Sequence, residues 1–356
     1  MASKKGKKKM SGKNRKLIIA FILVIVVATG LTFWSFYRKV FVPNVVLKRA
    51  STQYIYIPTG STFPDVMRIL QDKGYLKNSE SFRWVAEQMN YPLLVKPGRY
   101  LIKQKMNNRE LIGLLRSGRQ TPLRLTFSNI RTVEQLAGVV GNKIEADSAS
   151  IAFLFLDEVF QKTYGFTAQS SLSIVIPNTY EFYWNTSAEE FYKRLAKEYK
   201  KFWSDKRQAK AAKIGLTQAE VSTLASIVEQ ETRRNDEKPV IAGVYLNRYR
   251  KGWKLEADPT LVYALGDFTI RRVLNEYKEI DSPYNTYMYT GLPPGPICMP
   301  SVASIDAVLN YQAHNYLFFC ARSDFSGYHA FATTYAQHLV NARKFQKELN
   351  RRNIRS

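Results

Sequence analysis

An uncharged apolar run near the N-terminus constrains this chain more than any other feature. The 21 residues from Leu17 to Tyr37 contain no acidic or basic side chain. As a helix they would rise about 31 Å, enough to cross a hydrocarbon core of about 30 Å. Trp34 and Tyr37 stand at the far end of the run, where membrane spans carry aromatic belts. The sequence therefore predicts one transmembrane helix over residues 17–37.

The residues before this run set its expected orientation. Residues 1–16 contain eight Lys and Arg and no acid, so 24 − 8 leaves +16 of the +24 formal charge for the remainder. The positive-inside rule places such a tail in the cytoplasm and everything after about residue 38 outside it. A cleaved signal peptide is the alternative, but its apolar region usually has about 7–15 residues and a small-residue cleavage site follows it. We expect a single-pass protein of the cell (inner) membrane that contacts lipid through residues 17–37.

This orientation limits the partners and the chemistry. A basic domain outside the cytoplasm does not meet nucleic acid, so an anionic envelope polymer or the lipid surface is the expected partner. His314, His329 and His338 do not stand at a metal-ligand spacing, and no phosphate-binding glycine loop occurs. We therefore expect no metal and no other cofactor. Cys298 and Cys320 are equally compatible with a disulfide and with two free thiols.

The rest of the chain predicts an α+β fold with two folded parts. After a linker at residues 38–51, residues 52–120 alternate short strands and short helices, which indicates a compact α+β module. Ser79 or Ser81 is the expected cap of one of these helices, and Gly118 is expected to close another. Such a module either grips a substrate or acts as a spacer above the membrane. Residues 121–350 predict a larger mixed α+β domain, with one long amphipathic helix in "SAEEFYKRLAKEYKKFWSDKRQ".

Two glutamates stand one residue apart in the helical segment "LTQAEVSTLASIVEQET". Thr217 and Glu220 form the T-x-x-E pattern that marks a helix start. At 100° per residue, a stripe of apolar side chains runs along this helix and includes Glu231. Glu229 lies about 120° from the centre of that stripe, where solvent or an ion pair with Arg233 four residues on is expected.

A carboxyl group held against apolar surface is penalised when it ionises, so its pKa should rise. A general acid needs this condition at neutral pH, and Glu231 is therefore the candidate catalytic acid. A buried salt bridge between Glu231 and an arginine from elsewhere in the domain explains the same position equally well.

Polar residues downstream complete a candidate site. A second helix ends at Asn247, and a loop with Asp258 and Thr260 follows it. Residues 281–300 have little regular pattern and five prolines, and they present Tyr284, Asn285 and Tyr287. Amide and phenol groups on a stiff loop suit a sugar polymer, although a structural crossover has the same composition.

Together these segments resemble the YceG-like endolytic murein transglycosylases. The resemblance rests on "LASIVEQET", "GVYLNRYRKGWKLEADPTLVY", "SPYNTYMYTGLPPGPI" and "GYHAFATTYAQH", taken in this order and spacing. A weaker similarity in "KPGRYLIK" and "NNRELIGLLRSG" implies that residues 52–120 form the LysM-like glycan-binding module of the family, followed by the catalytic domain.

The resemblance implies an anchored lyase that cuts nascent peptidoglycan strands internally. Such enzymes break the β-1,4 bond between N-acetylmuramic acid and N-acetylglucosamine without water and leave a 1,6-anhydro-muramyl end. Glu231 matches the single glutamate that acts first as acid and then as base, and Thr232 completes a Glu-Thr pair with it. His329 is expected to form a cleft wall or donate a hydrogen bond, and cell-wall synthases are expected as protein partners.

Two other functions fit parts of the same pattern. A glycan hydrolase usually needs a pair of carboxylates, and Asp258 is the one candidate for the second, although Asp-Pro-Thr is more typical of a loop cap. A noncatalytic scaffold that binds peptidoglycan and recruits synthesis proteins would need the anchor and the small module but no acid. The products of a glycan digest distinguish all three.

Overall fold

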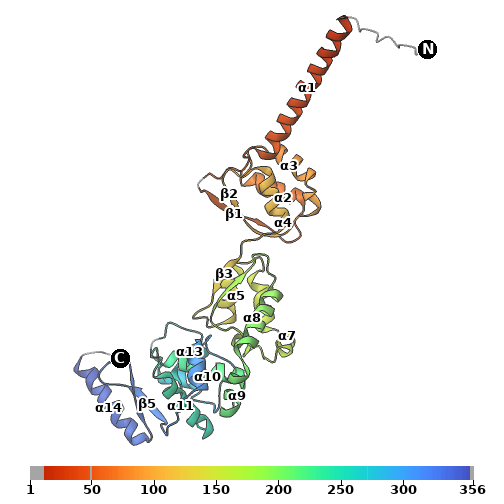
Figure 1. Cartoon of the computed structure of the whole chain (residues 1–356). Coiled ribbons are helices and arrows are strands. Elements are labelled where there is room, and N and C mark those ends of the chain that lie inside the picture. Colours follow the sequence, from red (N-terminus) through yellow and green to blue (C-terminus); the bar gives the residue numbers. More distant parts are fainter. Residues whose placement is uncertain (1–11, 49, 271, 353–356) are drawn as a thin grey trace. The chain divides into compact units, whose positions relative to one another are not determined.

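A computed structural model of the chain describes residues 12–48, 50–270 and 272–352. Its first helix, α1 (Gly12–Phe41), is apolar and exposed along most of its length (Figure 1). Of the described helices, it is the one long and apolar enough to cross a membrane, and it contains the predicted span at residues 17–37. The predicted basic tail at residues 1–16 lies mostly outside the described residues, which begin at Gly12.

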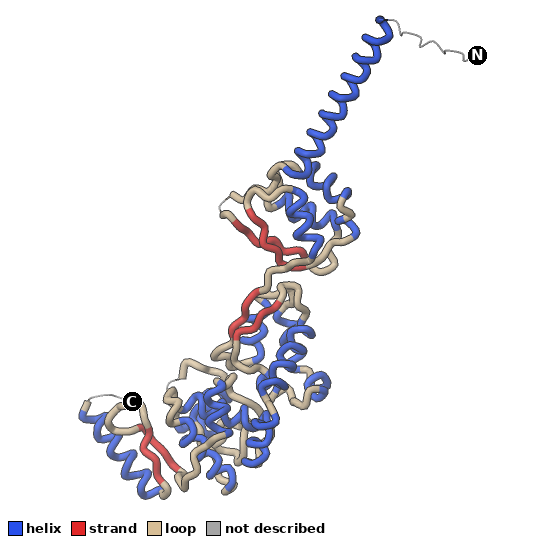
Figure 2. Tube along the Cα trace, in the orientation of Figure 1, coloured by secondary structure: helices blue, strands red, loops and turns tan. Residues whose placement is uncertain are grey.

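The chain divides into two compact units. The first comprises residues 1–122 and 183–185, and the second comprises residues 123–182 and 186–356. Each unit contains both helices and strands, which confirms the predicted α+β class (Figure 2).

In its described residues, the first unit combines one antiparallel strand pair with α1, three further α-helices and one short 3-10 helix. The strands pair from Thr52 opposite Lys103 to Ile57 opposite Gly98. Ile55 and Ile57 alternate with outward-facing residues, as a strand with one covered face requires. The bounds are β1 (Thr52–Ile57), α2 (Phe63–Asp72), α3 (Ser79–Gln88), η1 (Tyr91–Leu93), β2 (Gly98–Lys103) and α4 (Asn108–Ser117).

Local residues fix the ends of these helices. The N-cap of α3 is Asn78, so the prediction of Ser79 or Ser81 was wrong by one position or more. The Asn78 side chain accepts a hydrogen bond from the backbone N–H of Ser81 at 2.8 Å. Gly118 ends α4 in the left-handed conformation at φ 72°, as predicted, because glycine adopts it without a Cβ clash.

The end of α1 belongs to the core of the first unit. Val40, Val45 and Leu47 fall within the predicted linker 38–51, yet all three are buried in that core. The buried Asn108 side chain donates to the Lys39 carbonyl at 2.8 Å, and α1 packs against α3 and α4. The membrane-span candidate and the module are therefore parts of one folded unit.

The second unit begins with a short strand pair and a group of helices. Strand β3 pairs with β4 from Leu123 opposite Phe182 to Thr126 opposite Thr179. The bounds are β3 (Leu123–Thr126), α5 (Val133–Gly141), α6 (Ser148–Leu156), α7 (Glu158–Thr163), η2 (Ser171–Ile174), β4 (Thr179–Phe182), α8 (Ala188–Phe202) and α9 (Asp205–Ile214).

The single long helix predicted over residues 187–208 is two helices. Trp203 is buried and leaves the helical conformation at ψ 64°, and α9 starts one residue after Ser204. The Gln208 side chain donates a hydrogen bond to the Trp203 carbonyl at 2.7 Å. This carbonyl lies at the end of α8 and would otherwise lack a helical partner. The break was not predicted from the sequence, because no glycine or proline marks it.

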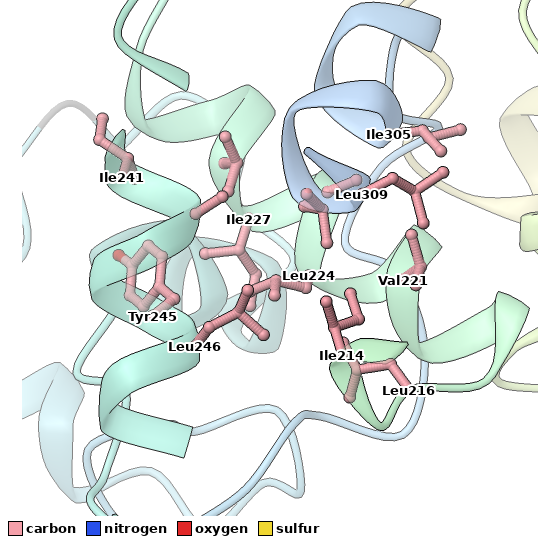
Figure 3. Packing of buried hydrophobic residues seen from close by; sticks show 14 of the residues in the cluster. Ile214, Leu216, Val221, Leu224, Ile227, Ile241, Tyr245, Leu246, Ile305 and Leu309 are labelled. Atoms are coloured by element: carbon pink, nitrogen blue, oxygen red, sulfur yellow. The ribbon is translucent and has the colours of Figure 1, made fainter. Parts of the chain in front are cut away.

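Three helices form the core that supports the candidate site. Val221, Leu224 and Ile227 of α10 pack against Ile241 and Leu246 of α11 and the apolar face of α13 (Figure 3). A hairpin and a C-terminal helix complete the unit (Figure 1). The bounds are α10 (Gln218–Glu231), α11 (Lys238–Arg250), α12 (Asp258–Leu265), η3 (Asn275–Glu279), α13 (Val302–Leu309), β5 (Phe318–Ala321), β6 (His329–Ala332) and α14 (Tyr335–Arg351).

The joint between α1 and the module predicts the effect of one substitution. Asn108→Ala removes hydrogen bonds to Lys39, Asn44 and Ser81 in a buried place, so it should destabilise the first unit by about 2 kcal/mol. Hydrogen exchange of α3 and α4 in the full chain should then accelerate about 30-fold. Gln88→Ala, an exposed change on α3, should leave the exchange within about twofold. Unchanged protection in the Asn108 variant would show that this joint does not hold the unit together.

Candidate active site

Helix α10 brings its two glutamates to different surroundings. The predicted capping box is present, with Thr217 and Glu220 exchanging hydrogen bonds at the helix start, and Glu231 is the last helical residue. Thr232 leaves the helical conformation and ends the helix. Glu231 is thus held at the end of a helix whose other face is packed in the core.

Glu229 forms a closed polar cluster with α11 and α13. Its carboxylate accepts hydrogen bonds from the buried Lys238 ammonium at 3.0 Å, from the Ser301 hydroxyl at 2.5 Å, and from Ser304. Burial raises the pKa of Glu229, but these donors outweigh it and hold the pKa below its usual value. The ion pair predicted from the sequence is therefore made with Lys238, from the next helix, in place of Arg233.

Glu231 has a different set of neighbours. The Tyr245 hydroxyl of α11 donates to one carboxyl oxygen of Glu231 at 2.5 Å. The pKa of Glu231 is raised to about 7, and burial is the main cause. The negative charge of Asp258 also raises this pKa, whereas the Tyr245 hydrogen bond lowers it. No ion pair involving Glu231 occurs among the residues that the structure describes. At neutral pH a large share of the carboxyl groups therefore carries a proton.

Two cavities meet at Glu231 and Asp258. The larger, of about 570 Å³, is lined by Gln230, Glu231 and Ile297 and by residues of α12 and the loop after it. The smaller, of about 280 Å³, lies beside Tyr245, Tyr287 and the hairpin. Both acids line both cavities, so a ligand that fills the two would pass directly over them.

Asp258 is fixed by one of the predicted loop residues. The Tyr287 hydroxyl donates to the Asp258 carboxylate at 2.5 Å, and burial together with that carboxylate raises the pKa of Tyr287. Asp258 was expected in a loop, but it is the first residue of α12, whose N-cap is Ala257. Its carboxylate accepts the Tyr287 hydrogen bond, and Asp258 lines both cavities.

A model of the YceG-like family matches residues 55–344, which is most of the chain. The chain belongs to the YceG-like family. The resemblance predicted from its motifs is thereby confirmed.

Relatives of known name and a solved structure extend this comparison. A Bacillus subtilis protein named endolytic murein transglycosylase is 28% identical over 331 residues, covering 88% of this chain and 90% of the relative. A Streptococcus pneumoniae protein of the same name is 26% identical over 340 residues, covering 86% of this chain and 61% of that longer relative. A crystal structure of a YceG-like protein from Listeria monocytogenes is 28% identical, with a TM-score of 0.55, covering 82% of this chain and 98% of that one.

Within this YceG-like chain, Thr260 and Asn285 line neither of the two cavities. Both are fully buried: the Thr260 hydroxyl donates to the Ala257 carbonyl at 2.7 Å, and the Asn285 amide donates to the carbonyls of Lys278 and Ile280. These bonds shape the loop that presents Tyr287. Tyr284 packs on Tyr263, a lining residue of the larger cavity, with ring centres 4.6 Å apart.

Thr232, Asn247 and His329 lie around the site and hold its parts together. Thr232 is buried, and its hydroxyl accepts from the Arg234 N–H at 3.0 Å. The Asn247 amide donates to the carbonyls of His314 and Tyr316. His329 Nδ1 lies 2.7 Å from the buried Glu237 carboxylate, which fastens β6 to the start of α11. The structure places none of the three on either cavity lining.

Other residues of the site had not been singled out from the sequence. Tyr245 contacts Glu231, while Arg131 and Phe268 line the larger cavity and Phe319 lines the smaller. The Arg131 guanidinium stacks on the Phe268 ring at 4.6 Å. Tyr245 stands in the segment "GVYLNRY" of α11, three residues after Ala242. The helical period therefore indicates that Tyr245 faces inward, but it does not indicate that Tyr245 contacts Glu231.

The residues that the structure describes contain no group of three or more His, Cys, Asp and Glu able to hold a metal ion. Both cysteines are free thiols: Cys298 is buried beside α10, and Cys320 lies in β5.

The two neighbours of Glu231 shift its pKa in opposite directions, which predicts opposite effects of two substitutions. Asp258→Asn removes a negative charge and should lower the pKa of Glu231, whereas Tyr245→Phe removes a donor to the carboxylate and should raise it. The measurement is a ¹³C NMR titration of labelled glutamate carboxyls, with the Glu231 signal identified by its loss in Glu231→Gln. The exposed Glu276→Gln serves as a matched control and should leave this pKa unchanged. Shifts of the same sign in the two test variants would contradict the described surroundings of Glu231.

Proposed function

We propose that this chain is an endolytic murein transglycosylase and that Glu231 is its catalytic acid. The names of the relatives that match most of the chain support the activity. The observation that carries the residue assignment is the position of Glu231, a carboxyl with a pKa of about 7 where two cavities meet.

In the proposed reaction one carboxyl group serves twice. Protonated Glu231 donates its proton to the oxygen between N-acetylmuramic acid and N-acetylglucosamine as that bond breaks. The resulting carboxylate then accepts the proton of the muramyl 6-hydroxyl, whose oxygen bonds to the anomeric carbon and closes the 1,6-anhydro ring. The proton returns to Glu231, no water is consumed, and the acid is ready for another cycle.

The neighbours of Glu231 suit both halves of this cycle. Burial keeps the acid protonated before cleavage, and the Tyr245 hydrogen bond stabilises the carboxylate after it. Asp258 faces the same cavities, and its negative charge suits the positive charge that develops on the sugar ring during cleavage. Tyr287 holds the Asp258 carboxylate in place.

The two cavities support cleavage inside a strand. An enzyme that cuts internally must bind sugars on both sides of the broken bond, and the lining of each cavity includes Glu231. The aromatic residues Phe268, Tyr287 and Phe319 offer ring faces to sugars, and Arg131 offers a cation to the muramyl carboxylates. Among the other predicted substrate-binding residues, Thr232, Asn247, Thr260, Tyr284, Asn285 and His329 act in this proposal by holding the loops and helices that carry these groups.

We assign the remaining parts of the chain by the same reasoning. The order strand, helix, helix, strand in residues 52–103 supports a LysM-like glycan-binding module at 52–120, with the catalytic domain at 121–350. The exposed apolar helix α1 supports a single-pass anchor in the cell (inner) membrane. The tail at 1–16 is then cytoplasmic and the catalytic domain extracytoplasmic. Cell-wall synthases that extend nascent strands are the protein partners that this location offers.

Mass analysis of a peptidoglycan digest tests the proposed activity and residue together. The wild-type chain should release fragments ending in 1,6-anhydro-N-acetylmuramic acid, and Glu231→Gln should reduce their rate at least about 100-fold, because general acid catalysis contributes that much. Glu229→Gln is the matched control on the same helix; per folded molecule it should retain most activity.

Three other results would each contradict the proposal. Reducing ends in place of anhydro ends would indicate a hydrolase that uses Asp258 as the second carboxylate. Unaltered cleavage by the Glu231 variant would show that another group is the acid. Binding without cleavage by the wild-type chain would favour a noncatalytic scaffold.

A further inference from the structure

A third cavity, comparable in size to the larger of the two at Glu231, lies within the first unit, where α1 meets α3. Its volume is about 620 Å³. The α1 side contributes Trp34, Ser35, Arg38 and Lys39, and the start of α3 contributes Lys77, Asn78, Glu80, Ser81 and Trp84, together with residues 42–44 between them. This cavity is separate from the two cavities at Glu231, which are lined by residues of the second unit.

The construction of α1 fixes the depth of this cavity, given the anchor proposed above. If residues 17–37 span the membrane, Trp34 and Tyr37 stand at its far edge and Phe41 lies about 6 Å beyond Tyr37. No free linker follows, because Val40 is in the module core and the Lys39 carbonyl accepts from Asn108 at 2.8 Å. The module cannot move away from the membrane surface, and the cavity lies at the depth of the lipid headgroups.

The charges around the cavity favour an anion. Arg38, Lys39 and Lys77 line it, against the single acid Glu80. None of these three cations forms an ion pair with any residue that the structure describes. The whole stretch 38–122 has fifteen Lys and Arg and five Asp and Glu, so the surrounding field has the same sign.

Aromatic rings complete an amphipathic lining. The Lys39 ammonium lies 4.8 Å from the centre of the Trp84 ring, and Phe36 meets the same ring edge to face at 6.0 Å. Trp34 is exposed. A lining that combines cations with aromatic rings matches a lipid at the interface, whose phosphate stands next to the start of its acyl chains.

We propose that this cavity binds the headgroup of an anionic phospholipid. Arg38, Lys39 and Lys77 contact the phosphate, and Trp34 and Trp84 lie beside the upper part of the acyl chains. A lipid held in this way adds a second contact between the first unit and the membrane surface, beside α1 itself. The inference rests on the proposed anchor and is independent of the proposed catalytic residue.

Lipid selectivity of the full chain tests this proposal. Reconstituted in phosphatidylcholine vesicles, the chain is titrated with trace spin-labelled phosphatidylglycerol or phosphatidylcholine, and the immobilised fraction of each is measured by electron paramagnetic resonance. Wild-type protein should prefer phosphatidylglycerol severalfold, and Lys39→Gln/Lys77→Gln should lower that preference by about half or more, while the basic residues 1–16 keep the remainder. Lys103→Gln/Arg116→Gln removes two exposed charges of the same unit outside the cavity and should keep the preference.

Each failure has a distinct signature. Wild-type protein that does not float with the vesicles would refute the anchor itself. Protein that floats but shows no preference, or loses it equally in both double variants, would refute the headgroup site. Displacement of phosphatidylglycerol by an equimolar polyprenyl diphosphate would overturn the assignment to a phospholipid. Thermal unfolding of the variants, expected to match wild type, excludes a loss of fold as the cause.

Discussion

The hydrogen bond from Tyr245 to Glu231 connects the packing of the second unit with its proposed chemistry. Its two partners stand on different helices, so the 2.5 Å contact exists only because α10 and α11 pack through a shared apolar core (Figure 3). The same burial that stabilises the helices removes water from the carboxyl and raises its pKa. The packing of α10 on α11 therefore both stabilises the second unit and raises the pKa of Glu231.

The contrast between the two glutamates shows how surroundings divide roles between identical groups. Glu229 is also partly buried, yet an ammonium and two hydroxyls hold it as a carboxylate and join α10 to α11 and α13. Glu231 has one phenol donor and a nearby negative charge, and it keeps a proton near neutral pH. A position two residues along one helix is enough to turn a structural ion pair into a candidate acid.

Helical periodicity predicted how Glu229 and Glu231 face, because that depends on residues of one helix alone. The partners of those side chains come from other helices, and the residues of one helix do not indicate which neighbours will pack against it. Lys238 in place of Arg233, and Tyr245 as the donor to Glu231, both follow from the packing of α11 on α10. The break between α8 and α9 at Trp203 likewise depends on a tertiary pocket for that ring.

The two units place different physical demands on the chain. The first joins an apolar helix to a basic module without a flexible connection, so the position of the module is tied to that helix. The second arranges buried polar residues such as Thr260 and Asn285 so that their hydrogen bonds shape loops around the cavities. Several candidate binding residues thus act through the backbone they hold, a role that composition alone does not distinguish from direct contact.

The pH dependence of anhydro-product formation by the wild-type chain tests the central claim most directly. Because the reaction needs protonated Glu231, the rate at low substrate concentration should fall about tenfold per pH unit above a midpoint near 7. Circular dichroism at each pH establishes that the fold is retained. A rate that stays constant from pH 6 to about pH 9, or that already falls with a midpoint near the ordinary glutamate pKa of about 4.3, would contradict the account.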